Sequence, residues 1–474
     1  MESTSWRHAT EEPVIVDTHD ELHDRSLAEL ARGLRAGMLD ARELTEHFIA
    51  RIQARPGSHV FISTCFDGAR QQAAQSAARW RAGRPLSPWD GIPLAWKDNI
   101  DVRGSATTAG AAAFRNAPPA TEDSAVAAHA RLCGLVTLGK ANLSEFAYTA
   151  LGLNPHFGTP ENPRSTDVPR APGGSSSGSA VAVALGLVPL AIGTDTGGSV
   201  RSPAAFNGVV GFKPAVGRYP MQGVFPLSVT LDTVGFFVRH AGDCQAVDAM
   251  LRDAVIEEGP QAAEPGLRDL VLVVPENVAL DDLEPEVARN FEASIARLAA
   301  AGARIVRRPV PQLGELQALV QRHGALASAD AYAAHRHLLD GGQLAGMDPF
   351  VRRRILAGKA MSAEDVQALR EGTRRLQCSL VADLPTGHAI AMPTVPHVAP
   401  PLALLRGSEE FFTATNLRTI RNTSLGNLLD LCGLSLPNGS GAAGMPTGIS
   451  FNAVAGAEPL LLARAAALAA ALEG

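Results

Sequence analysis

Residues 172–203 read PGGSSSGSAVAVALGLVPLAIGTDTGGSVRSP, and this stretch decides the fold. Two loops rich in glycine and serine flank an apolar segment that extends from Ala180 to Ile192. Gly186 and Pro189 interrupt the apolar segment, which indicates a short buried helix followed by a short buried strand. The sequence therefore predicts an apolar helix–strand unit with a glycine-rich loop at each end.

The second glycine-rich loop can gather backbone donors around one position. Glycine lets backbone N–H groups turn toward one point and lets a ligand come close. Consecutive residues could present their N–H groups in this way: Thr196, Gly197, Gly198 and Ser199. Such a nest binds an anion, or the oxyanion that forms during acyl transfer, and Ser199 at its end is placed to be a nucleophile. Loops of this composition also serve only as turns, and the loop alone leaves that alternative open.

Lysine is rare in this chain. Of the 42 lysines and arginines only four are lysines, at positions 97, 140, 213 and 359. Arginine stays protonated in proteins, whereas a buried lysine can lose its proton and act as a base, so a retained lysine points to such a role. Lys97 ends an apolar segment that begins at Gly91, which is typical of a strand that carries the lysine out of the core. The alternative for Lys97 is an ion pair with Asp98 or Asp101.

Several motifs taken together resemble the amidase signature family. They are Lys97-Asp98-Asn99, GKANLSEF at residues 139–146, GGSSSGS at residues 173–179 and GTDTGGSVR at residues 193–201. The similarity extends over about residues 27–220 and resumes over residues 427–449, whereas residues 240–385 match poorly. The joint pattern is far more specific than any single loop. The resemblance implies an α/β fold in which a mixed central β-sheet is covered by helices on both faces.

The resemblance also implies roles for individual residues. The Ser–cis-Ser–Lys triad of the family falls on Ser199 as nucleophile, Ser175 as bridge and Lys97 as base. The peptide bond between Gly174 and Ser175 is expected to be cis. The oxyanion hole of the family falls on the backbone amides of Thr196, Gly197, Gly198 and Ser199. The residues expected to support the two loops are Gly174, Ser176, Asp195 and Arg201. The resemblance implies no metal and no cofactor.

These roles imply that the chain hydrolyses a small carboxylic amide to an acid and ammonia through an acyl-enzyme. Ser199 would attack the amide carbonyl while Ser175 relays its proton to Lys97. Lys97 must be neutral for this step. A lysine that is half neutral near pH 7.4 has a pKa about 3 below its ordinary value, a difference of about 4 kcal/mol. Burial of the ammonium group is the expected cause.

Other reactions stay open as alternatives. The family also contains the A-type subunit of glutamyl-tRNA(Gln) amidotransferase, which uses the same triad but needs partner chains. Residues 427–432, NLLDLC, are similar to the allophanate hydrolase pattern. Residues 174–178 satisfy the G-x-S-x-G pattern of Ser-His-Asp α/β-hydrolases, but residues 167–172 do not indicate the buried strand that must precede such a turn.

Composition narrows the class of protein. Of 474 residues, 46% are hydrophobic and 19% charged, which is typical of a soluble protein with a well-formed core. The formal net charge of −6 provides no broad basic field, so we expect a small-molecule amide substrate and no direct nucleic-acid partner. Five scattered cysteines without a CxxC pair favour a reducing, cytoplasmic location. No signal peptide and no membrane span is expected, and a homodimer stays open.

A single domain over residues 1–474 is the simplest organisation. Its expected parts are a loose lead-in (1–25), a helical layer (26–83), the catalytic core (90–240), a variable and mostly helical elaboration (241–385) and the C-terminal part of the core (386–474). Capping boxes predict helix starts at Ser26 with Glu29 and at Asp40 with Glu43. Residues 460–472 predict one packed terminal helix. Buried strands are predicted at residues 94–96, 136–138, 190–192, 269–274, 303–306, 388–392, 434–436 and 448–451.

Two further motifs are weak. GLVTLGKA at residues 134–141 comes close to a phosphate-binding P-loop, but Ala141 stands where Ser or Thr is needed, and the apolar interior is typical of a strand. His19 and His23 have the spacing of zinc ligands on a helix, but no third ligand is well placed. Nucleotide binding and a metal site are therefore not expected.

Overall fold

The computed structural model describes residues 22–252, 265–342 and 346–473. These residues build an eleven-stranded sheet with the order β1-β3-β2-β4-β6-β5-β10-β11-β9-β7-β8. The strands are β1 (Phe61–Thr64), β2 (Pro93–Lys97), β3 (Val136–Ala141), β4 (Leu190–Asp195), β5 (Val210–Lys213), β6 (Thr233–Val238), β7 (Val271–Pro275), β8 (Arg304–Arg308), β9 (His388–Pro393), β10 (Cys432–Ser440) and β11 (Pro446–Ala453). The predicted strands are all present, with ends that differ by a few residues. Sequence reasoning missed β1, β5 and β6, and glycine interrupts the apolar runs of β5 and β6.

Three parallel strands, β3, β2 and β4, bring Lys97 close to the second glycine-rich loop. β2 lies between β3 and β4 and runs parallel to both, with Trp96 opposite Ile192. Neighbouring parallel strands end at the same edge of a sheet, so Lys97 at the end of β2 lies near the loop that follows Asp195 at the end of β4. The sheet continues through antiparallel pairs from β4 to β9, and β9, β7 and β8 are again parallel. The predicted mixed α/β fold is confirmed.

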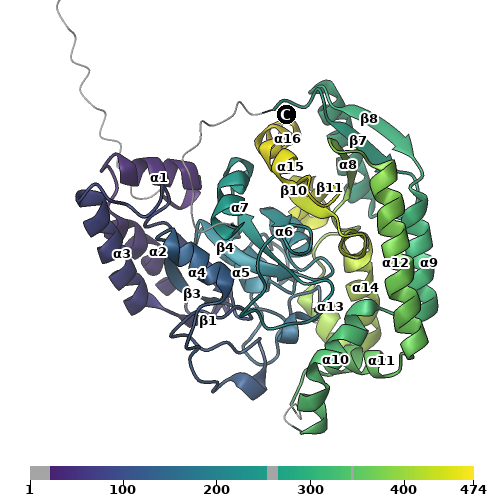
Figure 1. Cartoon of the computed structure of the whole chain (residues 1–474), viewed down its shortest axis with the longest axis horizontal. Coiled ribbons are helices and arrows are strands. Elements are labelled where there is room, and N and C mark those ends of the chain that lie inside the picture. Colours follow the sequence, from purple (N-terminus) through teal and green to yellow (C-terminus); the bar gives the residue numbers. More distant parts are fainter. Residues whose placement is uncertain (1–21, 253–264, 343–345, 474) are drawn as a thin grey trace, which may run out of the picture.

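Helices flank this sheet in the described parts of the chain. They are α1 (Leu27–Arg35), α2 (Ala41–Gln53), α3 (Phe66–Arg81), α4 (Ala125–Leu132), α5 (Ser177–Ala184), α6 (Arg201–Asn207), α7 (Cys244–Arg252), α8 (Pro285–Ala300), α9 (Pro311–His323), α10 (Leu326–Asp340), α11 (Pro349–Lys359), α12 (Ala363–Asp383), α13 (Leu402–Gly407), α14 (Glu409–Leu428), α15 (Glu458–Ala463) and α16 (Ala465–Glu473). Figure 1 shows α1, α2 and α3 on one side of the molecule and α9 and α12 on the opposite side. Of the helices described, none has the length and apolar character needed to cross a bilayer.

The two predicted capping boxes have different outcomes. At α1 the Ser26 hydroxyl accepts from the Glu29 amide at 3.2 Å and the Glu29 carboxylate accepts from the Ser26 amide at 2.8 Å, so this box is confirmed. At α2 the Asp40 carboxylate accepts from the Arg42 amide at 2.8 Å, but the predicted box with Glu43 is wrong. The Arg42 guanidinium also binds Asp40, at 2.7 Å, which holds this carboxylate over the first turn.

The chain ends of the described region also differ from expectation. The single terminal helix predicted over residues 460–472 is wrong, because α15 and α16 are separate helices on either side of Arg464. The Arg464 amide bonds to the Leu461 carbonyl at 3.2 Å, three residues back, so α15 closes in a tight turn before α16 begins.

At the N-terminal end of the described residues Leu22 is buried in a 3₁₀ turn, and Asp24 pairs with Arg239 at 2.8 Å. The remainder of the expected lead-in, with His19, lies outside the described residues.

Candidate active site

Lys97 lies fully buried at the end of β2. Its Nζ donates to the Ser175 hydroxyl at 2.7 Å and to the Thr194 hydroxyl at 2.8 Å, with the Thr194 carbonyl at 3.3 Å. Burial lowers the pKa of Lys97 to about 7, although the charges of Asp195 and Asp232 act in the opposite direction. The pKa of this lysine therefore lies well below that of an ordinary lysine.

The alternative expectation for Lys97, an ion pair with Asp98 or Asp101, is wrong. Asp98 pairs instead with Lys140 at 2.9 Å, and both side chains are fully buried. Asp98 also accepts hydrogen bonds from the Thr108 amide and hydroxyl. Consecutive residues of an extended chain point to opposite sides, so Lys97 and Asp98 face different surroundings. Residues 136–141 of the motif form β3, and Lys140 on this strand is held in the ion pair with Asp98, so the segment is not a phosphate-binding loop.

The first glycine-rich loop carries Ser175 to Lys97. The peptide bond between Gly174 and Ser175 is cis, as the resemblance implies. The Gly174 amide donates to the Ala150 carbonyl at 2.7 Å. The Ser176 amide donates to the Ser199 carbonyl at 3.2 Å, and the Ser176 hydroxyl donates to the Thr194 carbonyl at 3.2 Å. The two loops are therefore joined by main-chain and side-chain hydrogen bonds.

The Asp195 carboxylate holds the second glycine-rich loop through hydrogen bonds to its backbone amides. Its carboxylate accepts from the Gly198 amide at 2.8 Å and from the Val200 amide at 3.0 Å. Arg201 binds the same carboxylate through Nε at 3.1 Å and Nη2 at 3.0 Å, and Asn427 donates to it at 2.9 Å. Burial alone would raise the pKa of Asp195, but the Arg201 charge and these hydrogen bonds hold it well below its usual range. The carboxylate is thus ionised and anchors the turn that presents Ser199.

One of the expected oxyanion donors is already occupied. The Gly198 amide is bonded to Asp195, so the expectation that it contributes a free N–H is contradicted. Among the described residues, the amides of Thr196, Gly197 and Ser199 have no hydrogen-bond acceptor. Gly198 has instead a conformational role, since its φ is +128° and an added Cβ would lie 2.1 Å from the Thr423 hydroxyl.

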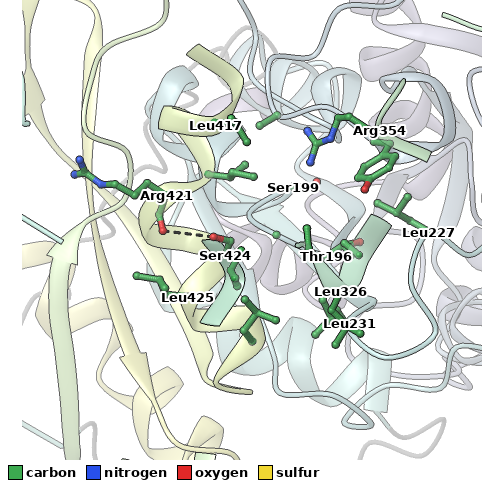
Figure 2. A pocket seen from close by; sticks show the side chains of 18 of the residues that line it. Thr196, Ser199, Leu227, Leu231, Leu326, Arg354, Leu417, Arg421, Ser424 and Leu425 are labelled. Carbon is green, nitrogen blue, oxygen red and sulfur yellow. Dashed lines mark hydrogen bonds between the residues drawn. The ribbon is translucent and has the colours of Figure 1, made fainter. Parts of the chain in front are cut away.

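Ser199 lines a cavity of about 420 Å³. Its hydroxyl has no hydrogen-bond partner in the described structure, and no hydrogen bond joins it to the Ser175 hydroxyl. Lys97 and Ser175 are therefore in direct contact, whereas Ser199 is linked to them through the backbone. Most of the cavity wall is apolar, and Figure 2 shows the side chains of Leu227, Leu231, Leu326, Leu417 and Leu425.

Several residues around the site were missed by sequence reasoning. Asp232 accepts from the Thr196 hydroxyl at 2.5 Å, and burial raises the pKa of Asp232 to about 6. Thr194 belongs to a motif that was recognised, and its position before Asp195 is the signal that could have revealed it. Tyr148 and Arg354 also line the cavity, and no local motif identifies them.

The described histidines do not support a Ser-His-Asp site. His335 bonds to the Pro226 carbonyl at 2.8 Å, and His397 bonds to the Thr419 hydroxyl at 3.0 Å. Burial lowers the pKa of each to about 4. No histidine in the described part of the chain hydrogen-bonds to Ser175 or Ser199. His23 packs against the His47 ring, and the described residues contain no group of three potential metal ligands.

Known proteins match this chain along most of its length. The family model described as Amidase matches residues 43–462. The chain is 35% identical over 444 residues to 2-amino-5-chloromuconic acid deaminase of Comamonas testosteroni, with 92% of this chain and 94% of that protein covered. It is 32% identical over 463 residues to the A-type subunit of glutamyl-tRNA(Gln) amidotransferase from Roseiflexus sp. (strain RS-1), with 91% and 93% covered. A solved crystal structure of an amidase has a TM-score of 0.83 and 31% identity, with 94% of this chain and 99% of that chain covered.

Proposed function

This chain belongs to the amidase family, and from that premise we propose that it hydrolyses a small carboxylic amide to an acid and ammonia through an acyl-enzyme on Ser199. The enzyme is an amidohydrolase that acts on C–N bonds, as its relatives and structural neighbours are.

One observation carries the proposed roles. Lys97 is fully buried among hydroxyl groups and donates to Ser175 at 2.7 Å. In the described structure it has no carboxylate partner. Burial lowers the pKa of Lys97 to about 7, so a large fraction of the lysine is neutral at neutral pH and can accept a proton. Two other buried lysines differ from Lys97 in their partners, since Lys140 has the Asp98 carboxylate beside it and Lys213 donates to the Pro214 carbonyl, whereas Lys97 donates to the Ser175 and Thr194 hydroxyls.

The reaction then follows two steps. Ser199 Oγ forms a bond to the amide carbonyl carbon, and its proton passes through Ser175 to Lys97. The C–N bond breaks as the leaving nitrogen takes the proton back along the same route, and ammonia departs. The oxygen of a water molecule then bonds to the ester carbon on Ser199 while Ser175 and Lys97 take a proton from the water. The bond from that carbon to Ser199 Oγ breaks, the proton returns along the same route to Ser199 Oγ, and the carboxylic acid leaves. The amide and one water are thus converted to one acid and one ammonia.

The developing oxyanion needs donors that are not already used. We assign this role to the amides of Thr196, Gly197 and Ser199, which have no acceptor in the described structure. Fixed donors of this kind stabilise charge that appears only in the transition state, and loss of one costs about 3–4 kcal/mol in other hydrolases. Gly198 supports the oxyanion hole indirectly, because the hydrogen bond from its amide to Asp195 fixes the turn that carries the other three amides.

A second candidate is a component of an amidotransferase complex. The 32% identity to the A-type subunit of glutamyl-tRNA(Gln) amidotransferase supports this candidate. Such a component would use the same residues but would act on its physiological substrate only in a complex.

Ammonia release by the purified chain alone separates the two candidates. A panel of primary amides that includes glutamine is incubated with wild-type enzyme and with Ser199→Ala. An independent amidase releases ammonia from at least one amide at enzymatic rates, and Ser199→Ala does not. If the isolated chain releases no ammonia from any amide of the panel, and partner chains restore the activity, the amidotransferase role is favoured.

We also propose a cytoplasmic location, because the five cysteines are scattered and are free thiols. A homodimer is compatible with the proposed chemistry. Light scattering of the purified chain measures the oligomeric state.

A further inference from the structure

Arg354 on α11 lies in the wall of the cavity that also contains Ser199. Figure 2 shows its guanidinium directed toward the part of the cavity where Ser199 lies. The guanidinium stacks over the Tyr148 ring, with 4.3 Å between the central carbon and the ring centroid. In the described structure it forms no ion pair and no hydrogen bond. A guanidinium has five N–H donors, and here all of them are free for a ligand.

The neighbouring arginines show that this arrangement is specific to Arg354. Arg353, one residue earlier, pairs with Glu409 outside the cavity. Arg421 also lines the cavity, but its Nε donates to the Asn422 side chain at 3.2 Å, and Figure 2 shows its guanidinium turned away from the cavity. None of the lining residues is an aspartate or a glutamate. The cavity therefore presents a positive charge without any internal counter-ion.

Tyr148 holds this guanidinium in a defined place relative to the catalytic loops. The tyrosine is 3% exposed, and its hydroxyl is bonded to the Ser328 hydroxyl at 2.6 Å. Two residues later, the Ala150 carbonyl accepts from the Gly174 amide at 2.7 Å, next to the cis peptide bond. The surface on which Arg354 rests is thus tied directly to the loop that carries Ser175.

We propose that Arg354 binds a carboxylate of the substrate, so that the preferred substrates are monoamides of dicarboxylic acids with a short hydrocarbon chain between the two ends. This inference rests on the proposed function and names its substrate class. A carboxylate matches the planar fork of a guanidinium, and one guanidinium balances the single charge of a carboxylate better than the double charge of a phosphate. The leucine-rich wall of the same cavity suits the hydrocarbon chain.

The test compares a matched pair of substrates, the monoamide of hexanedioic acid and hexanamide. We expect wild-type enzyme to favour the charged amide in kcat/KM by at least about tenfold, the factor that one charge-assisted hydrogen-bonded contact provides. Arg354→Gln should lower kcat/KM for the charged amide by at least about tenfold, mainly through KM, and leave hexanamide within about threefold. Arg354→Lys should retain part of the preference, since it keeps the charge but loses the fork. Arg353→Gln is the matched control and should leave kcat/KM unchanged for both substrates.

Two results would overturn the proposal. One is a wild-type enzyme that hydrolyses hexanamide as well as the charged amide. The other is an Arg354→Gln enzyme that loses both activities equally while its thermal transition is unchanged. Calorimetry in a Ser199→Ala background provides a readout that does not need turnover, because the monoamide should bind and binding should be lost when Arg354→Gln is added. Binding of the monoamide without any turnover by wild-type enzyme would contradict the proposed hydrolysis but support the carboxylate site. Turnover of neutral amides without binding of the monoamide would support the hydrolysis but contradict the carboxylate site.

Discussion

At the scale of single residues, two buried lysines on adjacent strands have opposite surroundings. Lys140 on β3 has a carboxylate partner, Asp98, at 2.9 Å. Lys97 on β2 bonds to the hydroxyl groups of Ser175 and Thr194. Both lysines follow apolar residues in the sequence, so local pattern alone cannot tell which one keeps a counter-ion. The pairing of β2 with β4 brings Thr194 to Lys97, and the first glycine-rich loop brings Ser175, both from distant positions in the sequence.

Replacement of Lys97 by arginine distinguishes a lysine that acts as a base from one that only provides a positive charge. Lys97→Arg keeps the positive charge but cannot become neutral, because a guanidinium stays protonated. We expect Lys97→Arg to lose at least about 100-fold in kcat, close to the loss in Lys97→Ala. Steady-state ammonia release measures this, and Lys359→Arg, the same change on an exposed lysine, is the control. Near wild-type activity in a folded Lys97→Arg enzyme would show that Lys97 is not the base.

Asp232 should contribute to the pH at which activity appears, beside the larger effect of burial on Lys97. Protonation of Lys97, whose pKa burial lowers to about 7, removes the base and limits activity on the acid side. Burial raises the pKa of Asp232 to about 6, so this carboxylate is mostly ionised where Lys97 titrates, and its charge favours the protonated lysine. Asp232→Asn removes that charge, so the pKa of Lys97 should fall and the acid limb of kcat/KM should move to lower pH.

A profile of kcat/KM from about pH 5 to 9 measures this shift. Asparagine retains an oxygen that can accept from the Thr196 hydroxyl, as Asp232 does, and circular dichroism checks that the fold is kept. An acid limb that stays in place or moves to higher pH would refute the coupling of Asp232 to Lys97.

At the scale of elements, the turn between β4 and α6 determines which backbone amides are free. Asp195 at the end of β4 accepts from the Gly198 amide, and Arg201 at the start of α6 holds the Asp195 carboxylate. The sequence motif identified this loop and its residues. It could not show that Gly198 donates inward to Asp195, because that depends on the path of the turn, in which Gly198 has a φ of +128°.

Two adjacent glycines in this turn should respond differently to alanine. Gly198→Ala places a Cβ 2.1 Å from the Thr423 hydroxyl at a φ that disfavours any side chain. We expect it to lower the free energy of unfolding by about 1–3 kcal/mol. Gly197→Ala is the matched comparison, since its Cβ would meet only the Ser424 Cβ at 4.0 Å. Urea denaturation of both variants measures the difference, and equal stability of the two would contradict this account of the turn.

At the scale of the whole molecule, the catalytic residues and the cavity come from different parts of the chain. Lys97, Ser175 and Ser199 lie in contiguous motifs within the first half, and these motifs were sufficient to predict the α/β fold and the proposed triad. Most of the cavity wall comes instead from α9, α10, α11 and α14, in and after the region where the resemblance is weak. Helical periodicity predicts such helices but not which residues face Ser199, so Arg354 became visible only in the folded chain.

The central claim is that turnover passes through an acyl group on Ser199, and rapid-quench mass spectrometry tests it most directly. The enzyme is mixed with a primary amide that it hydrolyses, quenched in acid during the first turnover, digested and mapped. The account predicts a peptide containing Ser199 whose mass has increased by the acyl group, with no such peptide from Ser199→Ala. Turnover without any acylated peptide at any quench time, or an acyl group that maps to another residue and persists in Ser199→Ala, would contradict it.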